Sequence, residues 1–165
     1  MSPPPLLALS LTYWLHMLAT VVWIGGLAAL SILVIPTARG ALEPGAYSHL
    51  LEGIQRRIDP LGWLCLAVLA GTGLFQMSAN SNYHGFLAIN NRWALAILVK
   101  HLVFIGMTIA STYLTWGVLP NLRRAALRRN EAEVQHFQRR EALLLRLNLV
   151  LGVVILALTA LARSS

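Results

Sequence analysis

Cysteine, lysine and acidic residues are all scarce in this chain. The single cysteine, Cys65, excludes an internal disulfide, a covalently attached c-type haem and a metal cluster built on several thiolates. The single lysine, Lys100, stands against twelve arginines, and there are only six acidic residues. The one ammonium group therefore needs its own explanation.

Long apolar runs dominate the rest of the sequence. Hydrophobic residues make up 57% of the 165 residues, charged residues 12%, and the mean hydropathy is +0.65. This composition is typical of polytopic membrane proteins and not of soluble globular domains. Four runs reach or approach the length of about 20 residues that a spanning helix needs. They cover residues 6–36, 61–77, 93–119 and 143–162.

The predicted fold is all-α: an integral membrane four-helix up-down bundle with both termini outside, forming a single transmembrane domain over residues 1–165. We expect its helices at about 6–36, 60–78, 92–119 and 142–162. A cytoplasmic surface helix is expected at about 44–58, where apolar residues recur at helical spacing. Asp59 would then cap the second spanning helix, and Pro60 would begin it.

The arginines are concentrated in two of the three connections. They are Arg39, Arg56 and Arg57 in the first, and Arg123, Arg124, Arg128, Arg129, Arg139, Arg140 and Arg146 in or beside the third. The positive-inside rule places both connections in the cytoplasm, so we expect a multi-pass protein of the cell (inner or plasma) membrane. Orientation alone explains these cations, and nucleic acid is not expected as a partner.

Two histidines lie inside apolar runs at matching depth. His16 follows Leu6 by ten residues, roughly 15 Å along a helix, and His101 follows Arg92 by nine, roughly 13.5 Å. The two helices run the same way in an up-down bundle, so both imidazoles can lie at one level. This arrangement suits axial ligation of a haem iron. The alternative is that each histidine only hydrogen-bonds a neighbouring helix.

Other polar residues share the faces of these helices. Thr20 and Trp23 lie on the face of His16 and join it as candidate cofactor-binding residues, because a hydroxyl there could orient the imidazole. A polar stripe on the second helix is instead expected to hold helices together. It consists of Cys65, Thr72 and Gln76.

Lys100 directly precedes His101. An ammonium at the centre of a spanning helix costs roughly 2.5 to 3.5 kcal/mol on insertion scales and usually finds a counter-charge or water. No carboxylate is expected at that depth, because Asp59 and Glu141 fall at cytoplasmic helix ends. A haem or porphyrin propionate would serve, with Arg92 as the second cation of this helix. The alternative is that Lys100 extends outward to the interface.

Short motifs in two of the runs resemble the copper resistance D (CopD) family. The first run has Trp14-Leu15-His16, Trp23-Ile24-Gly25-Gly26 and Pro36, and the third has Leu98-Val99-Lys100-His101-Leu102 and Leu119-Pro120. The resemblance implies a membrane protein connected with copper. The methionine clustering that soft Cu(I) favours is missing around these residues.

The same arrangement is similar to the four-helix, haem-dependent membrane protoporphyrinogen IX oxidases. That family has a first-helix histidine, an arginine-rich approach to the second helix, as in Gln55-Arg56-Arg57, and a third-helix lysine. The resemblance implies that His16 and Lys100 are functional residues. His101 and the Gly25-Gly26 pair depart from the oxidase pattern.

The sequence thus favours a haem-b-binding membrane redox protein, which transfers electrons or oxidises a small substrate such as protoporphyrinogen IX. His16 and His101 would be the metal ligands, and the partners would be membrane lipid and a redox partner or porphyrin substrate; an oligomer is compatible with the sequence. The alternative is copper ion transport, in which His16, His101 and Met107 pass the ion along the bundle. A third interpretation is an accessory subunit whose polar residues only specify helix packing.

Overall fold

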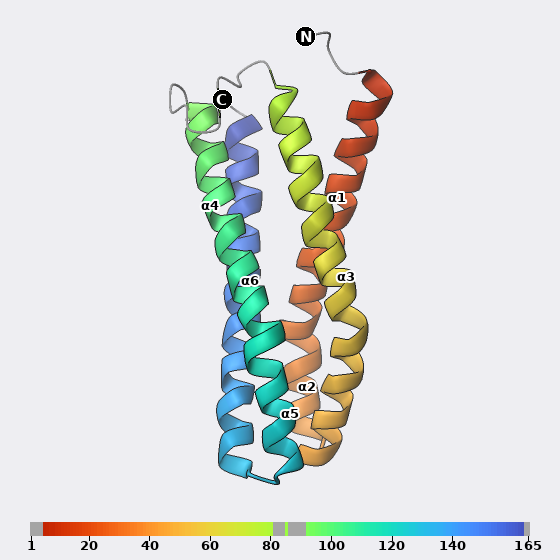
Figure 1. Ribbon diagram of the computed structural model, residues 1–165, viewed down its shortest axis with the longest axis vertical. Helices are drawn as coiled ribbons and strands as arrows, with labels where there is room; N and C mark the ends of the chain where they lie inside the picture. Colours follow the sequence, from red (N-terminus) through yellow and green to blue (C-terminus); the bar gives the residue numbers. More distant parts are fainter. Residues whose placement is uncertain (1–4, 81–84, 86–91, 164–165) are drawn as a thin grey trace.

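The computed structural model describes residues 5–80, 85 and 92–163. Its elements are α1 (Leu6–Ala28), the π-helix η1 (Ala29–Val34), α2 (Ile35–Ala41), α3 (Pro44–Ser78), α4 (Arg92–Thr112), the π-helix η2 (Tyr113–Val118), α5 (Leu119–Leu127) and α6 (Glu131–Arg163). Because η1 and η2 join their neighbours end to end, the chain forms four long helical rods (Figure 1). The first consists of α1, η1 and α2, the second of α3, the third of α4, η2 and α5, and the fourth of α6. Each rod is long and apolar enough to cross a membrane. The prediction of an all-α, four-helix membrane protein is confirmed; most of the loop before Arg92, with His84, lies outside the described residues.

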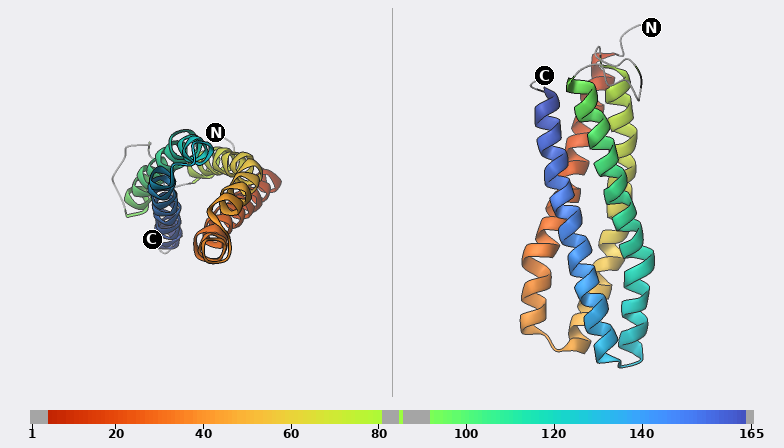
Figure 2. Two further views of the ribbon diagram at one scale, coloured as in Figure 1. Left: turned by 90° about the horizontal axis from the view of Figure 1, so that it is seen from below. Right: turned by 90° about the vertical axis from the view of Figure 1, so that its left-hand side faces the viewer.

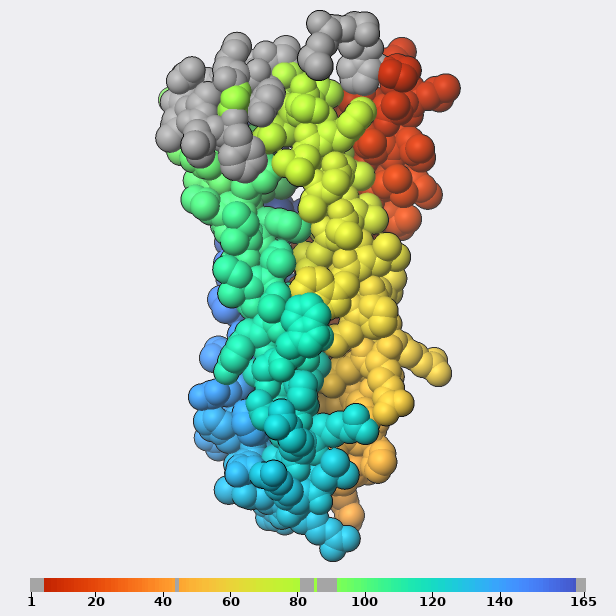
Figure 3. All heavy atoms as spheres, viewed as in Figure 1, coloured from red at the N-terminus to blue at the C-terminus, as the bar shows by residue number. Residues whose placement is uncertain are grey.

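The rods follow one another around an arc in chain order (Figure 2). The most extensive packing joins α1 to α3 and α4 to α6, and α6 also contacts α1 and η1. On the face seen in Figure 3, the column of α4 and α5 lies beside that of α3. The beginning of α1 and the end of α6 lie at the same end of the molecule (Figure 1), as an up-down order requires.

Two of the rods contain a proline, and in each the helix widens to a π-helix just before that proline. The ring of a proline clashes with the carbonyl four residues earlier, which is Ile32 for Pro36 and Trp116 for Pro120. Both carbonyls lie inside a π-helix, where the N–H of Ile35 bonds Leu30 and that of Leu119 bonds Leu114, five residues back. The wider turn relieves the clash. Both helices therefore continue beyond the expected bounds of 36 and 119, to Ala41 and Leu127.

The predicted helix over 44–58 forms and begins at Pro44, but the predicted restart at Asp59-Pro60 is wrong. Helix α3 runs without a break from Pro44 to Ser78 and contains Pro60. Its first turns pack inside the bundle, where Tyr47 and Leu51 are only 2% and 3% exposed and share a core with residues of α1, α2 and α6. Burial of these apolar side chains against three other helices stabilises the segment within the bundle.

The orientation of the bundle stays a prediction from the arginine distribution. A tag at either terminus should be labelled from outside intact cells, because the positive-inside rule places the arginine-rich end at residues 121–140 in the cytoplasm. Protease added outside should cut that segment only after the cells are opened. Cleavage of it in intact cells would contradict the orientation.

Gly62 lets α1 and α3 approach each other at Trp23. A Cβ placed on Gly62 would lie 2.6 Å from the Trp23 ring, whereas one on Gly71, in the same helix, would meet nothing within 4 Å. Gly62→Ala should therefore lower the free energy of unfolding by about 1 to 3 kcal/mol through overpacking. Gly71→Ala is the matched control and should be neutral or slightly stabilising. Thermal unfolding in detergent measures both, and equal midpoints would contradict the role of Gly62.

Candidate functional site

His16 is held by a hydroxyl on the neighbouring helix. Its Nδ1 lies 2.8 Å from Oγ1 of Thr72 on α3. The Thr72 hydroxyl donates its only proton to the carbonyl of Val68, so its oxygen must accept from Nδ1–H of His16. This fixes the tautomer whose lone pair is on Nε2. A histidine prepared to bind a metal has this form, with one nitrogen donating to a partner and the other left as the ligand.

Thr72 was predicted as a contact between helices, and the structure confirms that role while giving it a second one. The same stripe of α3 continues with Gln76, whose Nε2 donates to the carbonyl of Thr12 at 3.1 Å. Thr20 was expected to help orient the imidazole. Its hydroxyl instead donates to the carbonyl of His16 at 2.7 Å, so it caps a carbonyl of its own helix.

Lys100 of α4 lies close enough for its charge to act on the imidazole of His16. The side chain is half-buried, and none of the ion pairs between described residues involves it. Both described ion pairs join arginines to Glu52 instead. The charge of Lys100 on α4 thus acts on His16 of α1 through space, and these are the two residues that the sequence singled out by their rarity at this depth.

His101 has the same tautomer as His16, but the hydrogen bond that fixes it is made to the backbone of its own helix. Its Nδ1 donates to the carbonyl of Ile97 at 2.7 Å, which places the lone pair on Nε2. In the described part of the chain, α1 and α4 do not pack closely against each other. Helix α3 lies between them on the arc of helices (Figure 2). Ligation by both His16 and His101 stays a prediction. Arg92 lies exposed at the start of α4.

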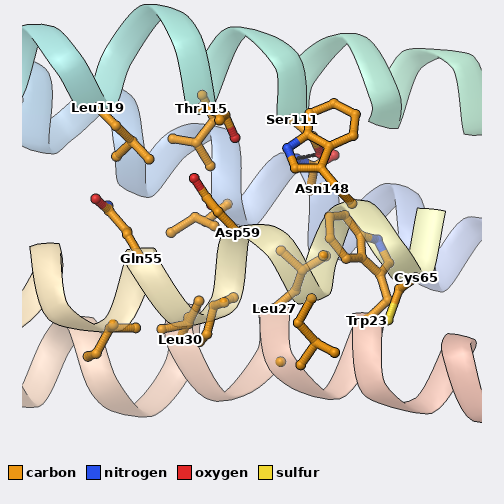
Figure 4. A pocket seen from close by; sticks show the side chains of 18 of the residues that line it. Trp23, Leu27, Leu30, Gln55, Asp59, Cys65, Ser111, Thr115, Leu119 and Asn148 are labelled. Carbon is orange, nitrogen blue, oxygen red and sulfur yellow. Dashed lines mark hydrogen bonds between the residues drawn. The ribbon is translucent and has the colours of Figure 1, made fainter. Parts of the chain in front are cut away.

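A cavity lies between the helices further along the bundle (Figure 4). The space between its atoms amounts to about 910 Å³, including the part that opens to the outside. Trp23 belongs to this cavity, and its indole Nε1 is buried without a hydrogen-bond partner among the described residues. Ser111 and Asn148 meet on the opposite side, where the Asn148 amide donates to the serine hydroxyl at 3.3 Å.

Glu141 is the residue that the sequence analysis placed wrongly. It was expected at a cytoplasmic helix end, yet only 1% of it is exposed, and it lines the cavity. The signal was present in the sequence, because Val134, Glu141, Leu145 and Asn148 recur at spacings of seven, four and three and all four are buried. A helix that begins at Glu131 carries this stripe into the bundle.

The described residues contain no group of three or more histidine, cysteine, aspartate or glutamate side chains that could hold a metal ion. A model of the copper resistance protein D (CopD) family matches residues 52–162, about two thirds of the chain. The chain belongs to the copper resistance protein D family. No curated protein and no solved structure matches it. The resemblance to protoporphyrinogen oxidases has no support among these comparisons.

The CopD match and the four spanning-length helices together make this a multi-pass membrane protein. The matched region contains Lys100, His101 and the cavity residue Glu141. His16 and Trp23 precede it. The first-helix motif that suggested the family is therefore outside the part of the chain on which membership in the CopD family rests.

Proposed function

We propose that this CopD-family protein binds haem b through His16 and takes part in membrane redox chemistry. The observation that carries the proposal is the hydrogen bond from His16 to Thr72, which leaves Nε2 of His16 as a lone-pair donor within the membrane. Haem iron takes such a nitrogen as its axial ligand. His101, with the same tautomer, is the candidate second ligand.

The number of available ligands favours a haem over a bare metal ion. A tightly held copper or zinc ion usually takes three or four protein ligands, whereas the macrocycle supplies four nitrogens and leaves one or two positions to the protein. The described residues offer no group of three histidine, cysteine, aspartate or glutamate side chains that could hold a metal ion.

The position of Lys100 also favours a haem. Its ammonium acts on the imidazole of His16, so it would repel a bare cation bound there. The same ammonium would attract a carboxylate of a porphyrin. In this arrangement His16 holds the metal and Lys100 holds an anionic edge of the ring system, which fits electron transfer or the oxidation of a bound porphyrin substrate such as protoporphyrinogen IX. When bound, the haem supplies the one-electron chemistry.

The absorption spectrum of the purified protein tests this proposal. Protein expressed with haem available, extracted in mild detergent and purified should have a Soret band and an α band that sharpens on reduction. Iron and copper should be measured on the same sample. Iron close to one atom per chain together with this spectrum is the expected result, and bound copper without it would overturn the proposal.

Copper transport is the second candidate, and the family match favours it. The name of the family links it to copper, and His16, His101 and Met107 supply nitrogen and sulfur atoms that Cu(I) accepts. Met107 of α4 is 2% exposed, and its side chain reaches toward Gly152 of α6. Uptake of Cu(I) by vesicles containing the purified protein, lost in a Met107→Leu variant, would support transport.

A further inference from the structure

Three residues that line the cavity each have one side-chain polar atom that is buried without a hydrogen-bond partner among the described residues. These atoms are Nε1 of Trp23, Oε2 of Glu141 and Oδ1 of Asn148. Unpaired groups of this kind each cost roughly 1 to 3 kcal/mol, and more when charged. Glu141 and Asn148 are 1% and 0% exposed, so neither reaches bulk solvent. A donor, an acceptor and a carboxylate oxygen are thus left for something that enters the cavity.

Glu141 has no ion pair of its own in the described structure. Its Oε1 accepts a hydrogen bond of 2.9 Å from the amide of Gln55, which is an uncharged partner. Arg39 acts on Glu141 only at a distance, because its guanidinium donates to the Tyr47 hydroxyl and to the carbonyl of Gln138. The second oxygen therefore lacks a cation in contact with it.

Glu141 and Asn148 lie well apart along the cavity, whose lining also includes the carboxyl group of Asp59 and the hydroxyl group of Thr115. Glu141 and Asn148 lie seven residues apart on α6, about 10.5 Å along the helix axis. Leu27, Leu114 and Leu145 are among the residues that line the space as well. Such walls suit the body of an apolar molecule and would not hold a hydrated metal ion.

Aromatic rings line the same cavity. Trp23 enters it from α1, pointing toward the region of Asn148 (Figure 4). Trp63 of α3 also lines it, and its ring centroid is 4.9 Å from that of Trp116. The faces of tryptophan rings attract organic cations, and the attraction is strongest where water is excluded.

We propose that this cavity binds a lipophilic organic cation: a molecule with one positive charge, an aromatic body and amino or hydroxyl groups at its ends. The positive charge would lie toward Glu141, the aromatic body would lie against the tryptophan rings, and an amino group at the far end would donate to Oδ1 of Asn148. This site is separate from His16 and does not depend on haem or copper binding.

Ethidium is a suitable probe because it combines a positive charge, a planar aromatic body and amino groups at both ends. Titration of the purified full chain in detergent should give a saturable rise in ethidium fluorescence with one site per chain. Glu141→Gln should weaken binding about tenfold or more, because the amide keeps the shape and removes the charge. Asn148→Leu should weaken it several-fold. Glu133→Gln changes an exposed carboxylate of the same helix and should leave it unchanged.

A comparison of two probes on the wild-type protein tests the proposal without any variant, and it therefore holds even if a cavity variant folds poorly. The neutral 3,8-diamino-6-phenylphenanthridine has the ring system and amino groups of ethidium without its fixed charge, so wild-type protein should bind it at least about tenfold more weakly. Equal binding of the two probes would overturn the proposal. So would ethidium binding that does not saturate, or that is the same in folded Glu141→Gln protein.

Discussion

Replacing His16 with alanine should remove most or all of the bound haem while the bundle still folds. His16 supplies the lone pair on Nε2, and no other residue of α1 takes its place, because Met17 points to a different face and is 67% exposed. The haem-to-protein ratio from the pyridine haemochrome spectrum measures the loss. The exposed His49 is the matched control, and His49→Ala should keep the wild-type ratio.

Two further variants separate ligation from general stability. Thr72→Val removes the acceptor for Nδ1–H of His16 and should weaken haem binding by about 10-fold to 100-fold, since partners of metal-bound histidines have effects of this size. His101→Ala should lose haem or leave a five-coordinate, high-spin iron. An unchanged low-spin spectrum would exclude His101 as an axial ligand. Haem retained in full by His16→Ala would contradict the proposed site itself.

The four spanning helices could be predicted because length and hydrophobicity alone determine them. Their ends could not, because they depend on contacts with other helices. Pro36 and Pro120 are strong local signals for a helix end, yet a π-helix before each proline lets the helix continue. Likewise, Asp59-Pro60 is a good start signal, but Tyr47 and Leu51 are buried against other helices and keep α3 in one piece.

The sequence could single out the site residues whose type is rare within the apolar runs. It could not single out a hydrogen-bond partner such as Thr72, because many hydroxyl groups occur in these helices. His16 and Lys100 stand out because imidazole and ammonium groups are uncommon at membrane depth, and the charge of Lys100 acts on His16. The pairing of His16 with Thr72 depends on how α1 and α3 are rotated about their axes, which one sequence does not reveal. Glu141 was misplaced because the start of α6 was set eleven residues too late, at 142 rather than Glu131.

Replacing Lys100 with methionine should leave expression and folding intact but weaken the binding of haem or porphyrin. The substitution removes a charge that is costly within a membrane, so the bundle itself has little to lose. It also leaves the anionic edge of a bound ring system without its counter-ion. We expect about tenfold weaker haem binding and a larger loss of any porphyrin turnover, since a charge-assisted hydrogen bond is worth roughly 1.5 to 3 kcal/mol.

The controls for Lys100 test both its charge and its shape. Lys100→Arg should restore binding only in part, because the broad guanidinium fork does not occupy the position of a compact ammonium. Arg92→Met removes an exposed cation from the start of the same helix and should have little effect. Haem content and midpoint potential are measured for all three variants. If Lys100→Met leaves both unchanged, the ammonium extends to the interface, and the interaction proposed here between Lys100 and a porphyrin carboxylate is wrong.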